Sequence, residues 1–371
     1  MPEPEKKLRR GIATGACLAA GAVGAWLARE GEPEPRRAEV LFPDGSRHEI
    51  GLFDAYSLAG CGIAVVRKDA GDDPDITDGA LFKVTICESD CPPGFYDHRL
   101  VCGRARLLLR GGPGIGLVTR PGLDTDSGFW AINPVPRRML VDNLEACGLG
   151  RQKKTYLVLV EAPDGVRLAA KTLNPVLGVV DGLSILGTSG YVEPYSHQAY
   201  IETIRILLKG ARRAGCRTAA LCTGGRTARA VARDHPELPD HAIIRIADFI
   251  ADSLKLAAEF EFDRVIVACM AGKLYKYSTG LEYTHAHTVR SDCGRLAQLA
   301  ADIGVDRRRV EVCRRSGSVR EAMTGLRPDE ISEIYERLGR QALAELTKWF
   351  GREAVELRLY DPRGALLKEW M

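Results

Sequence analysis

One loop in the first half of the chain concentrates acidic side chains. Five aspartates stand within eleven residues, at Asp69, Asp72, Asp73, Asp75 and Asp78. Like charges at this density repel one another, so an ordered loop of this kind needs a cationic or N–H-bearing partner. The functional interpretation is a carboxylate site for a cation, a sulfonium or a substrate N–H group. A solvated acidic turn is the alternative, and the loop lacks the glutamate at position twelve of an EF-hand.

Two glycine loops in the second half follow predicted strands. They read Thr223-Gly224-Gly225-Arg226-Thr227 and Met270-Ala271-Gly272-Lys273. Glycine lets backbone N–H groups approach a ligand, and the N-terminus of the following helix favours a carboxylate or phosphate. Neither loop is a P-loop, because GxxxxGK[ST] is absent, and neither has the full GxGxxG fingerprint. Ordinary strand-to-helix turns are the alternative.

A third loop, residues 182–190, is made of small residues and includes Gly187 and Thr188. It lies at the predicted domain boundary, where ligand clefts commonly form. A hinge without ligand contact is the alternative interpretation.

Basic side chains in the first half suit a ligand with several carboxylates. The candidates are Arg120, the pair Arg137 and Arg138 at the start of a helix, and Lys171, which precedes Asn174. The arginine fork binds a carboxylate through two parallel hydrogen bonds. Taken singly, each of these residues is also explained by solvation at the surface.

Metal ligation has weak support. His285 and His287 would face the same side of an extended segment and could reach one metal ion. Cys87 and Cys91 form a CxxxC couple, but the second couple that a zinc site of this kind needs is absent. We therefore predict no protein-bound metal. The odd count of eleven cysteines, with no CxxC pair, favours buried or free thiols in a reducing cytoplasm over a disulfide framework.

Length and pattern predict two domains. A chain of 371 residues exceeds the usual ceiling of a single core, about 250 to 300 residues. Up to residue 190 short strands dominate, with a helix at 135–147 and a hairpin turn at 163–165. Beyond it, strands in RTAALCT, AIIRIA, RVIVAC and VELRLY alternate with helices near 196–213, 227–235, 248–260, 292–303 and 329–350. We expect an α+β domain with a mixed or antiparallel sheet at 1–190 and an α/β Rossmann-like domain with a parallel sheet at 191–371.

Charge and hydropathy exclude two classes of partner. A formal net charge of +3 is too small to indicate nucleic-acid binding through counterion release. The basic and apolar N-terminal segment 6–28 imitates a signal peptide, but a helix from Ala16, capped by Thr14, explains it better. No other stretch approaches the ~20 apolar residues that cross a bilayer, so we expect no membrane partner.

Taken in order, these segments resemble the cobalt-precorrin-5B C1-methyltransferase family of anaerobic cobalamin biosynthesis. The resemblance covers about residues 10–290, and is weak after about residue 300. It rests on TGAC at 14–17, KDAGDDPDITDGA, GPGIGLVTRPGL, AINPVPRRML, KTLNPVLGVVDGLSILGTSGYVEPYS, GKL and the Tyr283-Thr284-His285 segment. The chain departs from the family pattern at three places. Many relatives have Gly-His-Pro-Gly-Lys where this chain has Cys269-Met270-Ala271-Gly272-Lys273, and Asn where it has Tyr283. The first motif has Ala13-Thr14 in place of the commoner double threonine.

The resemblance implies S-adenosylmethionine-dependent methylation of C1 on a cobalt-containing, ring-contracted tetrapyrrole, giving cobalt-precorrin-6A. We expect the donor, a co-substrate, in the second domain and the tetrapyrrole in the first. The expected donor residues are Gly224, Gly225, Arg226, Gly272, Lys273, Gly187 and Thr188. The expected tetrapyrrole residues are Thr14, Arg120, Arg137, Arg138, Lys171, Asn174 and His285. The expected catalytic residues, one of which would accept the proton that the macrocycle loses, are Asp72, Asp73 and Asp75.

Two other classes stay open at this point. One is an enzyme that uses the glycine loops for a nucleotide phosphate, which the absence of a P-loop disfavours. The other is a non-catalytic corrinoid-binding protein, which the absence of a DxHxxG carrier motif disfavours. The sequence leaves the oligomeric state undetermined, so a homo-oligomer stays open.

Overall fold

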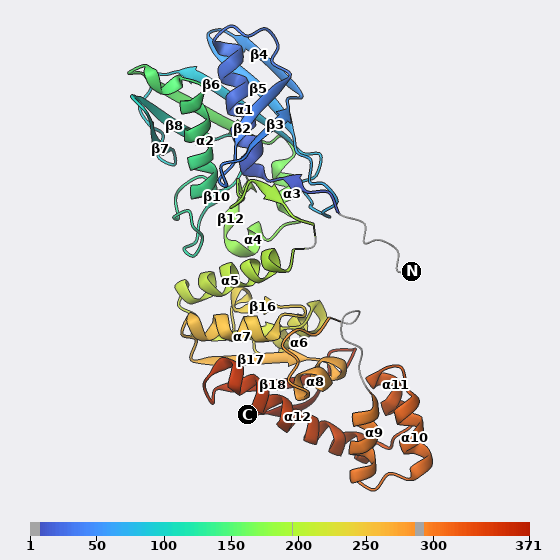
Figure 1. Ribbon diagram of the computed structural model, residues 1–371. Coiled ribbons are helices and arrows are strands. Elements are labelled where there is room, and N and C mark those ends of the chain that lie inside the picture. Colours follow the sequence, from blue (N-terminus) through green and yellow to red (C-terminus); the bar gives the residue numbers. More distant parts are fainter. Residues whose placement is uncertain (1–7, 195, 286–292) are drawn as a thin grey trace, which may run out of the picture. The chain divides into compact units, whose positions relative to one another are not determined.

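The computed structural model describes residues 8–194, 196–285 and 293–371. The chain forms two compact units, Met1–Ser196 and His197–Met371 (Figure 1). His287, the second histidine of the proposed metal pair, and residue 292, the predicted start of a helix, lie outside the described residues.

The first unit contains most of the strands. In chain order its elements are β1 (Gly11–Ile12), α1 (Thr14–Arg29), β2 (Arg37–Leu41), β3 (Arg47–Gly51), β4 (Asp54–Leu58), β5 (Cys61–Arg67), β6 (Leu81–Glu88), β7 (His98–Cys102), β8 (Ala105–Gly111), β9 (Gly114–Ile115), β10 (Leu117–Val118), α2 (Pro134–Ala146), the 3-10 turn η1 (Leu149–Arg151), β11 (Thr155–Glu161), α3 (Gly165–Ala169), α4 (Asn174–Leu177), β12 (Val179–Val180), β13 (Gly182–Leu183) and β14 (Tyr191–Val192).

A six-stranded mixed sheet forms the body of this unit, in the order β4-β5-β6-β11-β8-β7. All neighbours are antiparallel except β11 and β8, which are parallel. Every second residue of β6 and β11 is buried, as expected for strands with one face on a core. The predicted mixed sheet of the first half is confirmed.

Helix α1 is almost completely buried and packs against this sheet and against α2. Small residues on both elements allow this close approach. A Cβ atom at Gly62 of β5 would lie 1.7 Å from the carbonyl oxygen of Ala25 in α1. In the same way, Gly21 leaves room for Val84 and Gly24 for Leu52. The small residues that made this segment resemble a signal peptide therefore serve tight packing of helix on sheet.

Two local predictions in this unit are wrong. Thr14 does not cap α1, since the N-cap residue is Ala13 and the Thr14 hydroxyl bonds to a distant loop instead. Residues 163–165 do not form a hairpin, because the chain enters helix α3 at Gly165 after β11. There the backbone of Gly165 packs directly on Gly114, a contact that the local sequence does not reveal.

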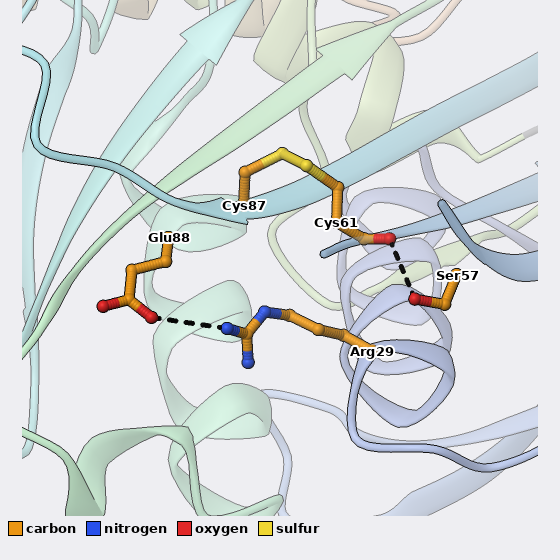
Figure 2. Close-up of a disulfide and its surroundings, with 5 residues drawn as sticks. All are labelled: Arg29, Ser57, Cys61, Cys87 and Glu88. Atoms are coloured by element: carbon orange, nitrogen blue, oxygen red, sulfur yellow. Dashed lines mark hydrogen bonds and ion pairs between the residues drawn. A yellow bond between two sulfur atoms is a disulfide. The ribbon is translucent and has the colours of Figure 1, made fainter. Parts of the chain in front are cut away.

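The thiol prediction also needs correction, because Cys61 and Cys87 form a disulfide with a Cα–Cα distance of 4.5 Å. The two residues end the antiparallel ladder of β5 and β6, one position beyond the partners Gly62 and Ile86. Figure 2 shows the bridge above the side chain of Arg29, which ion-pairs with Glu88 at 3.5 Å. The other nine cysteines are free. Strand register, which sequence spacing does not specify, brings these two thiols together.

The second unit alternates strands and helices. Its elements are α5 (His197–Arg213), β15 (Thr218–Cys222), α6 (Gly225–Asp234), the 3-10 turn η2 (Asp240–Ala242), β16 (Ile243–Arg245), α7 (Ile250–Glu259), β17 (Arg264–Cys269), α8 (Ala271–Ser278), α9 (Cys293–Asp302), α10 (Arg307–Arg315), α11 (Val319–Thr324), α12 (Pro328–Phe350), β18 (Val355–Tyr360) and β19 (Leu366–Trp370).

The sheet of this unit has the order β16-β15-β17-β18-β19. The first four strands are parallel, as predicted, and the edge strand β19 is antiparallel, which was not predicted. One face packs against α5, α7, α8 and α12, and the other against α6. With β15 as first strand the parallel order is 2-1-3-4, the flavodoxin-like doubly wound order rather than the 3-2-1-4-5-6 of the dinucleotide-binding Rossmann fold.

No helix among residues 8–194, 196–285 and 293–371 is both long enough and apolar enough to cross a membrane.

Candidate functional site

In the first unit, Thr14 joins the start of α1 to the small-residue loop. Its hydroxyl accepts a hydrogen bond from the Leu186 N–H at 2.8 Å and lies 3.2 Å from the Ser184 carbonyl oxygen. Gly187 follows with a φ of 132°, and a Cβ atom there would lie 2.5 Å from that of Ala13. Thr14 is 5% exposed, so its hydroxyl positions the loop that carries Gly187 and Thr188.

Asn174 supports the same loop from the other side. Its amide nitrogen donates to the Gly182 carbonyl at 2.9 Å, and its amide oxygen accepts from the Ser184 hydroxyl at 3.2 Å. The side chain is buried. Like Thr14, this predicted substrate residue therefore acts on the shape of the loop 182–188.

The partners of the acidic loop belong to the chain itself. Lys68 is 2% exposed and donates to Asp75 Oδ2 at 2.7 Å, while Asp75 Oδ1 accepts from the N–H and the hydroxyl of Thr77. Burial tends to raise the pKa of Asp75, but the charge and hydrogen bond of Lys68 outweigh it and the pKa is lowered. Both oxygens of Asp75 are thus engaged. The exposed carboxylate of Asp72 accepts the Arg9 N–H at 2.7 Å.

This loop lies against the segment that leads into α1. The Ile12 N–H donates to the Asp69 carbonyl at 2.8 Å, and Gly11 packs directly on the backbone of Ala70. Burial raises the pKa of Cys17 to about 12, although the charge of Lys68 acts in the opposite direction, so this thiol stays protonated at neutral pH. The start of α1, the acidic loop and the loop 182–188 therefore meet at one place.

The predicted basic residues differ in their surroundings. Arg138 and Lys171 are exposed, and the exposed Arg120 lays its methylene groups against Gly178. Arg137 is half-buried, and its Nη1 donates to Nδ1 of His98 at 3.1 Å. Short strand pairs connect these segments, because β9 pairs with β13 and β10 pairs with β12.

In the second unit, the glycine loops mark the switch point of the sheet. The loop after β15 leads to α6 on one face, and the loop after β17 leads to α8 on the other. A Cβ atom at Gly224, Gly225 or Gly272 would meet nothing within 4 Å. Open doubly wound sheets bind ligands at this point, outside the carboxyl ends of the strands. The helix N-termini of α6 and α8 both lie there.

Lys273, at the start of α8, is held by several polar contacts. Its ammonium ion-pairs with Asp248, which follows β16, and donates to the Thr284 hydroxyl at 2.7 Å. Lys276 is buried and donates to the Thr284 carbonyl at 2.9 Å. Burial and the charge of Lys273 lower the pKa of Lys276. Lys273 and Lys276 thus hold residues 283–285, where His285 stacks on Tyr283 at a centroid distance of 6.1 Å.

The predicted residue sets do not coincide completely with the two units. Gly187 and Thr188, predicted for the donor, lie in the first unit, whereas His285, predicted for the tetrapyrrole, lies in the second. Thr14, Asn174, Asp72, Asp73, Asp75 and the four basic residues share the first unit, and Gly224, Gly225, Arg226, Gly272 and Lys273 share the second. The described part of the chain contains no group of three metal-binding side chains.

Sequence reasoning overlooked three residues of these sites. Lys68 opens the acidic motif, and its place directly before the aspartates was a usable signal. Asp248 follows a predicted strand, which is the usual position for a polar residue at a ligand crevice. His98 had no local signal, since its partner Arg137 lies far away in sequence.

The comparisons with known proteins agree along the chain. The sequence model of the CbiD family matches residues 1–194, and that of the CbiD C-terminal domain matches residues 283–370. A protein of Nitratidesulfovibrio vulgaris named cobalt-precorrin-5B C(1)-methyltransferase is 38% identical over 371 residues, covering 97% of this chain and 92% of its own. Proteins of the same name from Polaromonas naphthalenivorans and Geobacillus kaustophilus are 37% and 34% identical, covering 85% and 98% of this chain and 83% and 95% of their own.

A crystal structure of the cobalamin biosynthesis protein CbiD from Archaeoglobus fulgidus is also similar, with a TM-score of 0.39 and 24% identity, over 72% of this chain and 79% of that one. The family matches in both units and the identities above 30% over most of the length lead to one conclusion: this chain belongs to the CbiD family.

Proposed function

We propose that this chain is a methyltransferase that transfers a methyl group from S-adenosylmethionine to C1 of cobalt-precorrin-5B, giving cobalt-precorrin-6A. The observation that carries the proposal is the 38% identity, over 97% of the chain, to a protein named cobalt-precorrin-5B C(1)-methyltransferase. The meeting of the acidic loop, the start of α1 and the loop 182–188 in one unit supports it.

The donor is assigned to the switch point of the doubly wound sheet in the second unit. A Cβ atom at Gly225 or Gly272 would meet nothing within 4 Å, so a ligand can approach the backbone at the start of α6 and of α8. Two helix N-termini and the exposed side chain of Arg226 suit the carboxylate of the methionyl group. Lys273 shapes this site through Asp248 and Thr284, and Lys276 donates to the His285 carbonyl at 3.4 Å.

The tetrapyrrole is assigned to the first unit, with Arg120, Arg137, Arg138 and Lys171 binding its acetate and propionate groups. Methyl transfer breaks the sulfur–carbon bond, leaves the electron pair on sulfur and forms the carbon–carbon bond at C1. It needs alignment more than an acid or a base. The macrocycle then loses a proton, and Asp72 and Asp73 are the proposed acceptors, while Asp75 holds Lys68.

The test is an anaerobic assay of the purified chain with S-adenosylmethionine and cobalt-precorrin-5B. We expect a tetrapyrrole product heavier by one methyl group and an equal amount of S-adenosylhomocysteine. Absence of both products under saturating substrates would overturn the proposal. Calorimetric titration with ATP and with S-adenosylmethionine distinguishes the alternatives: binding of ATP alone favours a nucleotide-phosphate enzyme, and tetrapyrrole binding without donor binding favours a non-catalytic corrinoid-binding protein.

A further inference from the structure

No carboxylate among the residues that the structure describes forms an ion pair with Arg137. Its Nε is buried without a hydrogen-bond partner, and its Nη1 bonds to a histidine. Burial lowers the pKa of Arg137. The charge of Asp126 has a smaller, opposite effect on this pKa. The neighbouring Arg110, by contrast, binds both oxygens of Asp97 at 2.9 and 2.7 Å. An unneutralised, half-buried guanidinium favours binding of an anion.

His98 orients this guanidinium without cancelling its charge. Its Nε2 lies 2.8 Å from the carbonyl oxygen of Trp130, which can only accept, so Nε2 carries the hydrogen. Nδ1 then presents a lone pair to Arg137. Burial, together with the charge of Arg137, lowers the pKa of His98, which keeps the imidazole neutral. Arg137 is thus fixed in place and keeps its full charge.

Phe129 adds an apolar surface at the same place. Its ring stacks on the imidazole of His98 with a centroid distance of 5.4 Å and an interplanar angle of 22°. The backbone is held rigidly, because the Val118 N–H donates to the Phe129 carbonyl at 3.0 Å and the Gly128 N–H to the Val118 carbonyl at 2.8 Å. The side chain is nevertheless 36% exposed.

We infer that Phe129, His98 and Arg137 form a subsite for one carboxylate-bearing edge of the tetrapyrrole. This inference rests on the proposed function and adds to it two residues and a division of roles. Phe129 packs against the flat, apolar macrocycle, as aromatic rings do with conjugated ligands. Arg137 binds an acetate or propionate group through its fork. His98 is a positioning residue that acts through Arg137.

The first experiment measures kcat and KM for cobalt-precorrin-5B with the donor saturating. Arg137→Gln is expected to raise this KM at least about tenfold, the effect of a lost charge-assisted hydrogen bond, and to leave KM for the donor unchanged. Arg99→Gln is the matched control. Arg99 is exposed, adjoins His98 on β7 and points to the opposite side of the strand. The Arg99→Gln substitution removes the same charge as Arg137→Gln and should not change KM for cobalt-precorrin-5B.

The second experiment separates positioning from folding. His98→Phe removes the acceptor at Nδ1 and should raise KM for the tetrapyrrole about as much as Arg137→Gln does, whereas His98→Asn keeps an acceptor and should restore most of the affinity. The double variant of His98→Phe with Arg137→Gln should be no worse than Arg137→Gln alone, because His98 acts through Arg137. Phe129→Leu, at an exposed position, should raise the same KM severalfold without altering thermal unfolding.

Equal KM values for wild type, Arg137→Gln and Arg99→Gln would overturn the inference, as would additive effects in the double variant. Equilibrium binding of cobalt-precorrin-5B without the donor, followed by its visible absorption, distinguishes this failure from that of the proposed function. If wild type binds without turnover and Arg137→Gln binds more weakly, methyl transfer fails as the function and the subsite stands. If wild type does not bind the tetrapyrrole, both fail.

Discussion

The ammonium of Lys68 lies 2.7 Å from Asp75 Oδ2, and the lysine is 2% exposed. A lysine buried this deeply is stable in its charged form only with a carboxylate beside it. The pair links strand β5, which Lys68 follows directly, to the acidic loop. Asp75, which the sequence predicted as a catalytic residue, is therefore the counter-ion of the buried Lys68.

We predict that Asp75→Asn lowers the free energy of unfolding by about 3 to 5 kcal/mol, because it leaves a buried ammonium without its carboxylate. Chemical denaturation followed by circular dichroism measures the change. Asp72→Asn, at an exposed position of the same loop, is the control and should stay within about 0.5 kcal/mol of wild type. Equal stability of the two variants would contradict the role given to Asp75.

The same pair predicts a pH dependence. The pKa of Asp75 is lower in the folded chain than its usual value of 3.8, so the unfolded chain binds more protons in the acid range. The contribution of the pair to stability is then complete above about pH 4 and is lost as the pH falls further. Asp75→Asn should remove this part of the acid sensitivity, which denaturation curves between neutral and acidic pH would reveal.

Asp72→Asn should lower kcat for methyl transfer more than it raises either KM, because the exposed carboxylate is a proposed proton acceptor and the substitution keeps its shape. Product formation under anaerobic conditions, quantified by mass, provides the measurement. A kcat within about a factor of two of wild type would place Asp72 among ordinary surface residues.

Gly225→Val should abolish binding of S-adenosylmethionine while the circular dichroism spectrum is unchanged. A Cβ atom at this position would meet open space and the φ is not positive, so valine fits the fold, yet its branches cover the N–H groups at the start of α6. Gly210→Val, in α5 and equally open, is the control. Undiminished donor affinity in Gly225→Val, measured by calorimetry, would remove this loop from the site.

Lys171→Ala should raise KM for cobalt-precorrin-5B at least about tenfold and leave KM for the donor unchanged, given roughly 1.5 to 3 kcal/mol for a charged hydrogen bond. Lys171 is exposed, so the fold should be unaffected. Lys153→Ala removes a charge from another exposed site of the first unit and serves as control. A rise in the donor KM instead would reverse the assignment of the two units.

Alkylation in denaturant without reductant should modify nine of the eleven cysteines and leave Cys61 and Cys87 unmodified. Mass spectrometry of the digest identifies them as one cross-linked peptide pair. Replacing both by alanine should cost about 2 to 4 kcal/mol of stability, because the bridge restricts the unfolded chain. Eleven modified thiols in protein purified without reductant would show that the bridge does not form.

Local pattern was enough to predict most of the elements. Short apolar runs in RTAALCT, AIIRIA, RVIVAC and VELRLY located β15 to β18, and the helix predicted at 135–147 matches α2 to within one residue at each end. The short strand β7 and the edge strand β19 were missed, because edge strands carry polar residues on both sides and lose their alternation. The turn at 163–165 was misassigned because Gly165 is required for close packing against Gly114, which is distant in sequence, and not for a hairpin turn.

For the candidate site, the sequence by itself determined which segments belong to it. The acidic loop, the glycine loops and the family resemblance all consist of short contiguous motifs. Only the tertiary structure decided what each side chain does there. Asp75 is engaged by the buried Lys68, Thr14 and Asn174 hold the loop 182–188, and Arg137 keeps its charge beside a neutral His98. The physical reason is that hydrogen bonding and burial depend on neighbours brought together from distant parts of the chain, and these set the charge and accessibility of a side chain more strongly than its type.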